Sequence, residues 1–96
     1  PRVADTVEII DLSPAQRTQL TAEIDTAARA LKVLFKPDKL NVAALGNLVP
    51  QLHVHVIARY HTDIAWPRPV WGNATARPYA PEELIERVRA LAAALV

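Results

Sequence analysis

The sequence predicts a small α+β domain in which an antiparallel sheet packs against two helices. Three observations lead to this fold class. The chain has 96 residues, the size of one domain at most, so residues 1–96 are expected to form a single unit. Hydrophobic residues make up 51% of it and charged residues 22%, which excludes a disordered tail. Two stretches have the apolar period of a helix, and one stretch between them alternates with the period of a strand.

The composition also excludes several classes of function. The chain has no cysteine, so it has neither a disulfide framework nor a cysteine-ligated metal site. Its net charge of +1, without a run of like charges, gives no electrostatic case for nucleic acid as a partner. The longest apolar run, residues 91–96, is far shorter than the ~18 residues that a membrane span needs. We therefore expect a cytoplasmic protein that binds neither nucleic acid nor membrane.

The first helix is expected after a short apolar stretch. Residues 1–6 are expected to form a loop, and residues 7–12 a brief strand or a docking turn. Ser13, Pro14 and Gln16 form a capping box with proline in the first turn, which predicts a helix that ends before Pro37. One face of that helix is apolar and carries Leu20, Ile24, Ala27, Leu31 and Leu34.

Two strands are expected next, over residues 39–45 and 51–61. Gly46 and Asn47 are typical of the turn between them, and Pro50 fits the entry of the second strand. In that strand the even positions are apolar, whereas the odd positions include all three histidines of the chain. Because successive side chains of a strand point to opposite faces, we expect one apolar face and one histidine face.

Residues 62–80 have no period and contain several prolines and both tryptophans, so we expect an ordered arm over the surface. Trp66 and Trp71 are expected to seal the surface or to anchor a dimer, with stacking on a base as the alternative. Residues 81–96 are expected to form the second helix, because Pro81 begins it and an apolar face follows at Leu84, Val88, Leu91 and Leu95.

The expected elements supply too few strands for a stable sheet. Two strands alone are marginal in water, and three or more are normally needed for independent stability. We therefore expect the N-terminal strands of the domain to lie upstream of Pro1 or to come from another chain. The chain contains no methionine, which fits the expectation of a start upstream.

The histidine face is the main candidate for chemistry. His53 and His55 lie two residues apart, so their α-carbons are ~6.7 Å apart on one face of the strand. Three interpretations remain open on spacing alone. The pair is solvated surface, or it binds a metal with His61 or Asp63 as a third ligand, or one ring is a nucleophile.

A family resemblance favours the nucleophile. Residues 46–59 resemble the signature of the histidine triad (HIT) family, in which a turn leads into three alternating histidines. Residues 65–72 resemble the corresponding segment of a bacterial branch, Pro1 and Arg2 resemble the end of the family's preceding strand, and Ser13 onward resembles its next helix. The resemblance covers the whole chain and begins partway through the family's domain.

The resemblance implies a HIT-like nucleotide hydrolase or transferase, acting at the α-phosphate of an adenosine phosphoramidate or a dinucleoside polyphosphate. His53 matches the nucleophile, which forms a covalent nucleotidyl-histidine, and His55 matches the histidine that binds the phosphate. Asn47 and Leu48 match the turn that meets the phosphate oxygens. The resemblance further implies a homodimer with a nucleotide substrate. No cofactor and no metal are expected.

The chain departs from the family pattern at two positions. Gln51 replaces the first histidine; glutamine can orient a neighbour but cannot act as acid or base. Leu48 replaces a serine or threonine whose hydroxyl contacts phosphate, and such a donor is worth roughly two or three powers of ten in rate. These departures keep open a nucleotide-binding module with little or no catalysis, and a histidine-based metal-binding protein is the further alternative.

Two more residues of this region have expected roles. Arg59 lies on the histidine face, where it balances phosphate charge or forms a salt bridge with Asp63 or Glu8. His61, at the end of the strand, is expected to be exposed.

Overall fold

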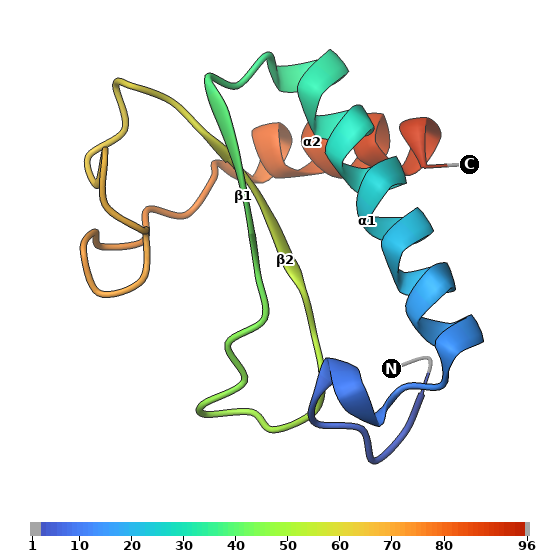
Figure 1. Cartoon of the computed structure of the whole chain (residues 1–96). Helices are drawn as coiled ribbons and strands as arrows, with labels where there is room; N and C mark the ends of the chain where they lie inside the picture. Colours follow the sequence, from blue (N-terminus) through green and yellow to red (C-terminus); the bar gives the residue numbers. More distant parts are fainter. Residues whose placement is uncertain (1–2, 96) are drawn as a thin grey trace.

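The computed structural model describes residues 3–95 and confirms the α+β class. Its elements are η1 (Ile9–Asp11), α1 (Pro14–Phe35), β1 (Lys39–Ala43), β2 (His55–Arg59) and α2 (Pro81–Ala94). In Figure 1, α1 runs along one side of the β1–β2 hairpin and the loop that follows β2 lies on the other side. α2 packs against α1. The hairpin is thus covered differently on its two faces.

The capping box predicted at the start of α1 is confirmed. The Ser13 hydroxyl accepts a hydrogen bond from the amide of Gln16 (3.2 Å), and the Gln16 side chain accepts one from the amide of Ser13 (2.8 Å). The helix ends at Phe35, and Lys36 takes the left-handed conformation with φ of 48°. This end lies just before Pro37, as expected, because the residue before a proline disfavours the helical conformation.

The two strands pair in antiparallel register from Lys39 opposite Arg59 to Ala43 opposite His55. Odd-numbered residues of both strands therefore share one face, and even-numbered residues share the other. The even face is the one toward α1, since the hydroxyl of Tyr60 donates to the carbonyl oxygen of Phe35 at 2.6 Å. The predicted alternation is confirmed within β2, where His55 lies on the odd-numbered face; His53 and His61, which were expected in the same strand, lie outside β2.

The second strand is shorter than predicted: β2 begins at His55 and ends at Arg59, whereas residues 51–61 were expected to be extended throughout. Instead of pairing with β1, this segment forms hydrogen bonds with the N-terminal loop. The amide of Leu52 donates to the carbonyl oxygen of Thr6 at 2.7 Å, in the loop before η1. β1 stops at Ala43 and offers these residues no partner strand, and Pro50 has no N–H to give to a ladder.

The stretch of residues 7–12 forms the 3-10 helix η1 and a buried Leu12, so of the two expected alternatives the brief strand is wrong and a turn forms instead. Glu8 and Asp11 form a capping box of their own, which closes this turn locally. Pro1 and Arg2, which resemble the end of a preceding strand, lie outside the described residues, as does Val96.

α2 begins with Pro81 in its first turn, as predicted, and reaches Ala94. Its predicted apolar face contacts α1 only in part: Leu84, Val88 and Leu95 stay about half exposed. The buried apolar core among the described residues is correspondingly small and consists of Leu12, Ala30 and Ala65. Within residues 3–95, no helix has the length and apolar character that crossing a membrane requires.

Candidate functional site

A cleft of about 410 Å³ lies between the β1–β2 connection, the start of β2 and the arm (residues 62–80). It brings together four of the five residues predicted to form the site: Asn47, Leu48, His53 and His55. The rest of its lining is Leu45, Gly46, Val49 and Trp71. The cleft is therefore assembled from a turn, one face of a strand and a distant loop. Its lining contains two imidazoles and no lysine or arginine.

The ring of His53 is held through one nitrogen. Its Nδ1 lies 2.7 Å from the backbone carbonyl oxygen of Gln51. A carbonyl oxygen can only accept a hydrogen bond, so Nδ1 carries the proton and donates it. In the neutral ring, Nε2 then has the free lone pair. Because His53 is also exposed, this nitrogen is available to an electrophile in the cleft.

His55, the first residue of β2, is half-buried between two other rings. Its ring centroid lies 5.1 Å from that of His53, with 73° between the planes, and 5.1 Å from that of Trp71, with 72° between them. Both contacts are edge-to-face, the preferred arrangement of aromatic pairs. His53, His55 and Trp71 thus form a row of three rings along the cleft.

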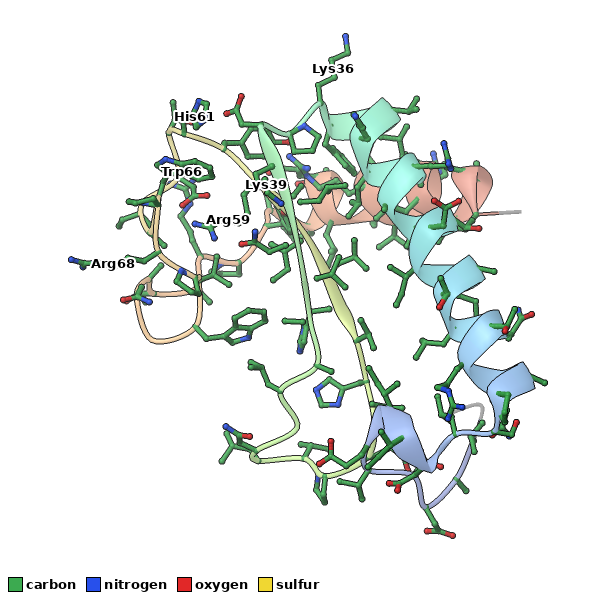
Figure 2. The ribbon with its side chains drawn as sticks, viewed as in Figure 1. Lys36, Lys39, Arg59, His61, Trp66 and Arg68 are labelled. Carbon is green, nitrogen blue, oxygen red and sulfur yellow. The ribbon has the colours of Figure 1, made fainter. Side chains whose placement is uncertain are left out.

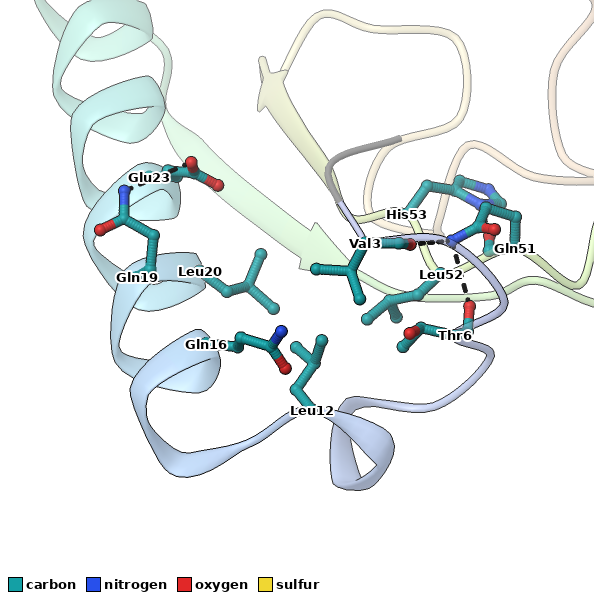
Figure 3. Close-up of a pocket in the computed structure, with 10 residues that line it drawn as sticks. All are labelled: Val3, Thr6, Leu12, Gln16, Gln19, Leu20, Glu23, Gln51, Leu52 and His53. Carbon is teal, nitrogen blue, oxygen red and sulfur yellow. Dashed lines mark hydrogen bonds between the residues drawn. The ribbon is translucent and has the colours of Figure 1, made fainter.

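The side chain of Gln51 lies outside this row. Its Nε2 donates to the backbone carbonyl oxygens of Val3 (2.9 Å) and Thr6 (3.2 Å). Figure 3 shows it beside a second cavity of about 410 Å³ between α1 and residues 51–53, lined by both aliphatic side chains such as Leu12 and polar ones such as Gln16. The contact between Gln51 and His53 is made by the backbone carbonyl, whereas the side-chain amide ties the histidine segment to the N-terminal loop.

The turn before the histidines is exposed and open to a ligand. Gly46 has φ of 69°, a left-handed conformation that favours glycine. The side chain of Leu48 is 97% exposed, so it packs against nothing in the chain and offers no hydroxyl to a phosphate. Asn47 is exposed as well. What the turn can offer to an anion is the Asn47 amide and its own backbone N–H groups.

Arg59 forms the predicted salt bridge with Asp63, at 2.8 Å, and the alternative pairing with Glu8 is wrong. The side chain is 2% exposed and does not line the cleft, so it does not meet a phosphate there. The hydrogen bond from Arg59 is the main cause that holds the pKa of Asp63 well below its usual range. Among the residues predicted for the histidine face, Arg59 is the one that the structure assigns to a structural contact.

The lowered pKa of Asp63 leads to a prediction about acid. An unfolded aspartate has a pKa of about 3.9, and the folded value lies below it, so the pair stabilises the fold above that pH and the contribution is lost as the pH falls further. We expect the free energy of unfolding to drop as the pH is lowered below about 4. Denaturant titrations at several pH values measure this, and Asp63→Asn should flatten the drop. An equally steep drop in that variant would contradict the assignment.

The third ligands considered for a metal lie away from the two cleft histidines. Asp63 is paired with Arg59, and Nδ1 of His61 lies 3.5 Å from Asp38, whose carboxylate also accepts the backbone amide of His61 at 2.8 Å. Residues 3–95 contain no group of three or more histidine, cysteine, aspartate or glutamate side chains placed to hold a metal ion. His61 is 67% exposed, as predicted.

The tryptophans take separate places in the arm. Trp66 lies edge-to-face with His61 at 4.7 Å and beneath the guanidinium of Arg59 at 5.6 Å. Trp71 reaches His55. Both were expected to seal the surface or to anchor a dimer, with stacking on a base as the alternative, and the contact of Trp71 with His55 was not predicted. Nor was Asn41 predicted, which accepts a hydrogen bond from Arg59 and lies on the odd-numbered face of the sheet. The strand register could have indicated Asn41, whereas the aperiodic arm offered no signal for Trp71.

Comparison with known proteins gives a consistent result. The family model of the HIT domain matches residues 1–62. A crystal structure of a histidine triad protein from Bradyrhizobium japonicum is 53% identical with a TM-score of 0.96; the match covers 100% of this chain and 72% of that one. The histidine triad protein of Sinorhizobium meliloti 1021 is 42% identical with a TM-score of 0.92, covering 99% and 70%. The one from Marinobacter aquaeolei VT8 is 44% identical with a TM-score of 0.92, covering 99% and 69%. No curated protein matches the chain.

Proposed function

Because the chain belongs to the histidine triad (HIT) family, we propose that it is a nucleotide hydrolase or transferase that acts at the α-phosphate through a covalent nucleotidyl-histidine. The proposed substrates are phosphoramidates of nucleotides or dinucleoside polyphosphates. The single observation that carries the proposal is the hydrogen bond from His53 Nδ1 to the Gln51 carbonyl, since it leaves Nε2 free in an exposed cleft. An imidazole held in this way is prepared for nucleophilic attack.

The proposed reaction has two steps at one phosphorus atom. The lone pair of His53 Nε2 attacks the α-phosphorus, a P–N bond forms, and the bond to the leaving group breaks. The leaving group keeps the electron pair and takes a proton from water. In the second step a water molecule attacks the phosphorus and loses a proton to solvent, the bond to Nε2 breaks, and the nucleoside monophosphate leaves. Nδ1 keeps its proton throughout and donates it to the Gln51 carbonyl oxygen, which stabilises the positive charge on the substituted ring.

His55 and the turn are proposed to hold the phosphate oxygens during these steps. His55 lies directly beside His53, so a phosphate at Nε2 of His53 is within its reach. Asn47 and Leu48 line the same cleft, and we propose the Asn47 amide and the backbone N–H of Leu48 as further donors to the phosphate. Hydrogen-bond donors aimed at the developing charge stabilise the transition state more than the ground state.

A second candidate function is a nucleotide-binding module with little or no catalysis. The exposed Leu48 favours it, because this position offers no hydroxyl to the phosphate. Incubation with adenosine phosphoramidate, with and without a chelator, separates the candidates. Release of adenosine monophosphate that the chelator leaves unchanged supports the proposed enzyme. Binding without turnover would support the module, and loss of turnover with chelator would support a metal-dependent protein.

The position of Leu48 gives a prediction of increased activity. Leu48→Ser places a hydroxyl at the phosphate turn, and we expect it to raise kcat/KM for adenosine phosphoramidate by about tenfold, a part of the ~10²–10³ that a well-placed donor supplies. Initial rates of phosphoramidate hydrolysis measure this. Val49→Ser is the matched control, because it adds the same hydroxyl to the next exposed residue of the turn. An equal gain in both variants, or a gain in neither, would contradict a phosphate at this turn.

We also propose that the protein acts in the cytoplasm as a homodimer. The apolar side chains that α2 leaves half exposed (Leu84, Val88 and Leu95) support a further packing partner. Light scattering on the purified protein measures the mass in solution. A mass of two chains fits the proposal, and a mass of one chain at micromolar concentration contradicts it.

A further inference from the structure

We propose that Arg59 is a positioning residue of the reaction: the pair of its buried guanidinium with the partly exposed Asp63 fixes the arm on the sheet and so places Trp71 against His55. The proposal rests on the proposed function, in which His55 binds the phosphate. Arg59 touches neither the cleft nor a ligand. It acts through the segment that it holds.

The guanidinium of Arg59 joins three separate segments of the chain. It donates to the carboxylate of Asp63 through two nitrogens (2.8 and 3.0 Å), to the side-chain oxygen of Asn41 in β1 (2.7 Å) and to the backbone carbonyl of Arg68 (2.7 Å). In Figure 2, Arg59 lies between the sheet and the arm, next to Trp66, whereas the side chain of Arg68 points outward. One buried cation therefore links the end of β2, the middle of β1 and the arm.

Asp63 completes this link on the side of the arm. Besides Arg59, its carboxylate accepts hydrogen bonds from the backbone amides of Tyr60 (3.2 Å) and Ala65 (3.1 Å). Ala65 is 4% exposed beside it. The first part of the arm is thus fixed by a carboxylate whose charge is matched by Arg59. Charge-assisted, two-pronged pairs of this kind fix orientation as well as distance.

The position of Trp71 follows from this anchor because the path between them is short and stiff. Only two residues, Pro69 and Val70, separate Arg68, whose carbonyl Arg59 holds, from Trp71. Proline fixes its own φ and restricts the residue before it. The side-chain amide of Asn73 then donates to the carbonyls of Pro69 (2.8 Å) and Trp71 (3.2 Å), which closes this turn on itself. Within this turn the ring of Trp71 lies against that of His55.

The buried charge of Arg59 is not explained by stability alone. Burying an ion pair is costly, and well-packed apolar residues of similar volume often stabilise a fold equally well or better. Apolar contacts, however, are non-directional and fix the position of a segment only loosely. The hydrogen bonds from Arg59 are directional, so they fix both the distance and the orientation of the arm. Fixing Trp71 to within a fraction of an ångström matters beside a catalytic group, since a 1 Å misplacement costs about 10²-fold in rate.

The test uses the fluorescence of Trp71 and the kinetics of the same variants. All variants are made in a parent protein that carries His61→Gln. This substitution removes the imidazole beside Trp66, so His55, which also contacts His53, is the histidine that remains against a tryptophan. An imidazole in contact with an indole quenches its emission, so at one fixed pH the emission of the parent should rise when His55→Ala is added; this rise measures the His55-dependent quenching of Trp71. Asp63→Asn and Arg59→Lys are made in this parent. Asp25→Asn is the matched control, because it breaks an exposed ion pair on α1 with Arg29.

We expect Asp63→Asn to lose at least half of the His55-dependent quenching and to lower kcat/KM about 10- to 100-fold, with Asp25→Asn unchanged in both. Arg59→Lys, which keeps the charge but not the fork of donors, should show the same losses in smaller measure. Circular dichroism shows whether each variant is folded. If Asp63→Asn is unfolded, the quenching and kcat/KM of Arg59→Lys test the proposal instead. Folded variants with the quenching and kcat/KM of the parent would overturn the proposal. If the parent has no turnover, the proposed function fails, and the quenching still decides whether Arg59 positions Trp71.

Discussion

Replacing His53 by alanine is expected to abolish turnover of adenosine phosphoramidate, with kcat falling by about 10⁴-fold or more. The physical reason is the loss of the imidazole in the cleft whose Nε2 lone pair is left free by the hydrogen bond at Nδ1. Without Nε2 there is no covalent step, and direct attack by water lacks the two-step path. Steady-state kinetics with the purified variant measures the loss.

His61→Ala is the matched control for this experiment. It removes the same side chain from the same segment, but His61 is exposed, contacts Trp66 and Asp38, and does not line the cleft. We expect its kcat to stay within about twofold of the unmodified protein, as for a surface substitution away from the site. If His53→Ala kept its turnover, or if both variants lost theirs equally, the role of His53 would be wrong.

Replacing His55 by alanine is expected to lower kcat/KM by about 10²- to 10³-fold, which is the effect of removing one donor to a developing negative charge. The ring is half-buried between His53 and Trp71, so its position is well defined for such a role. Because His53 stays in place, the covalent step remains possible and the residual rate should exceed that of His53→Ala. The same phosphoramidate assay measures both.

His55→Gln separates the donor from the ring. Glutamine keeps an N–H donor at this position but no aromatic face. We expect it to recover part of the rate that His55→Ala loses. A rate in His55→Ala within threefold of the unmodified protein would contradict phosphate binding by His55.

The elements that were predictable from the sequence are those set by local chemistry. The helix after Ser13 follows from a capping box and a proline, both of which act within four residues, and the structure keeps both. The histidine face follows from the period of two in a strand, and the register of β1 and β2 keeps it. The family was likewise apparent in the segment of residues 46–59.

The features that were not predictable depend on contacts between distant segments. The late start of β2 depends on hydrogen bonds between residues 51–52 and the loop before η1, which no local pattern reveals. Arg59 had several plausible partners, and only the path of the arm selects Asp63. The contact between Trp71 and His55 joins an aperiodic arm to a strand, so periodicity has no bearing on it.

The spacing of the histidines also left the kind of chemistry open. Two imidazoles on one strand face suit a solvated surface, a metal site or a nucleophile equally well. The geometry adds two observations that bear on the choice: Nδ1 of His53 is engaged by a carbonyl oxygen, and His55 is flanked by two rings. A histidine that binds a metal makes the same hydrogen bond to a carbonyl, so the choice against a metal site rests on the ligands: a metal needs further ones, and the described residues contain no group of three such side chains.

The most direct test of the central claim is the mass of the intact protein during turnover. Rapid acid-free quenching with adenosine phosphoramidate, followed by mass spectrometry of the protein and of its peptides, detects a phosphorus–nitrogen adduct. We predict one added nucleoside monophosphate group, on the peptide that contains His53, and its absence in His53→Ala. Turnover of the substrate with no adduct, or with the adduct on a different residue, would contradict the account.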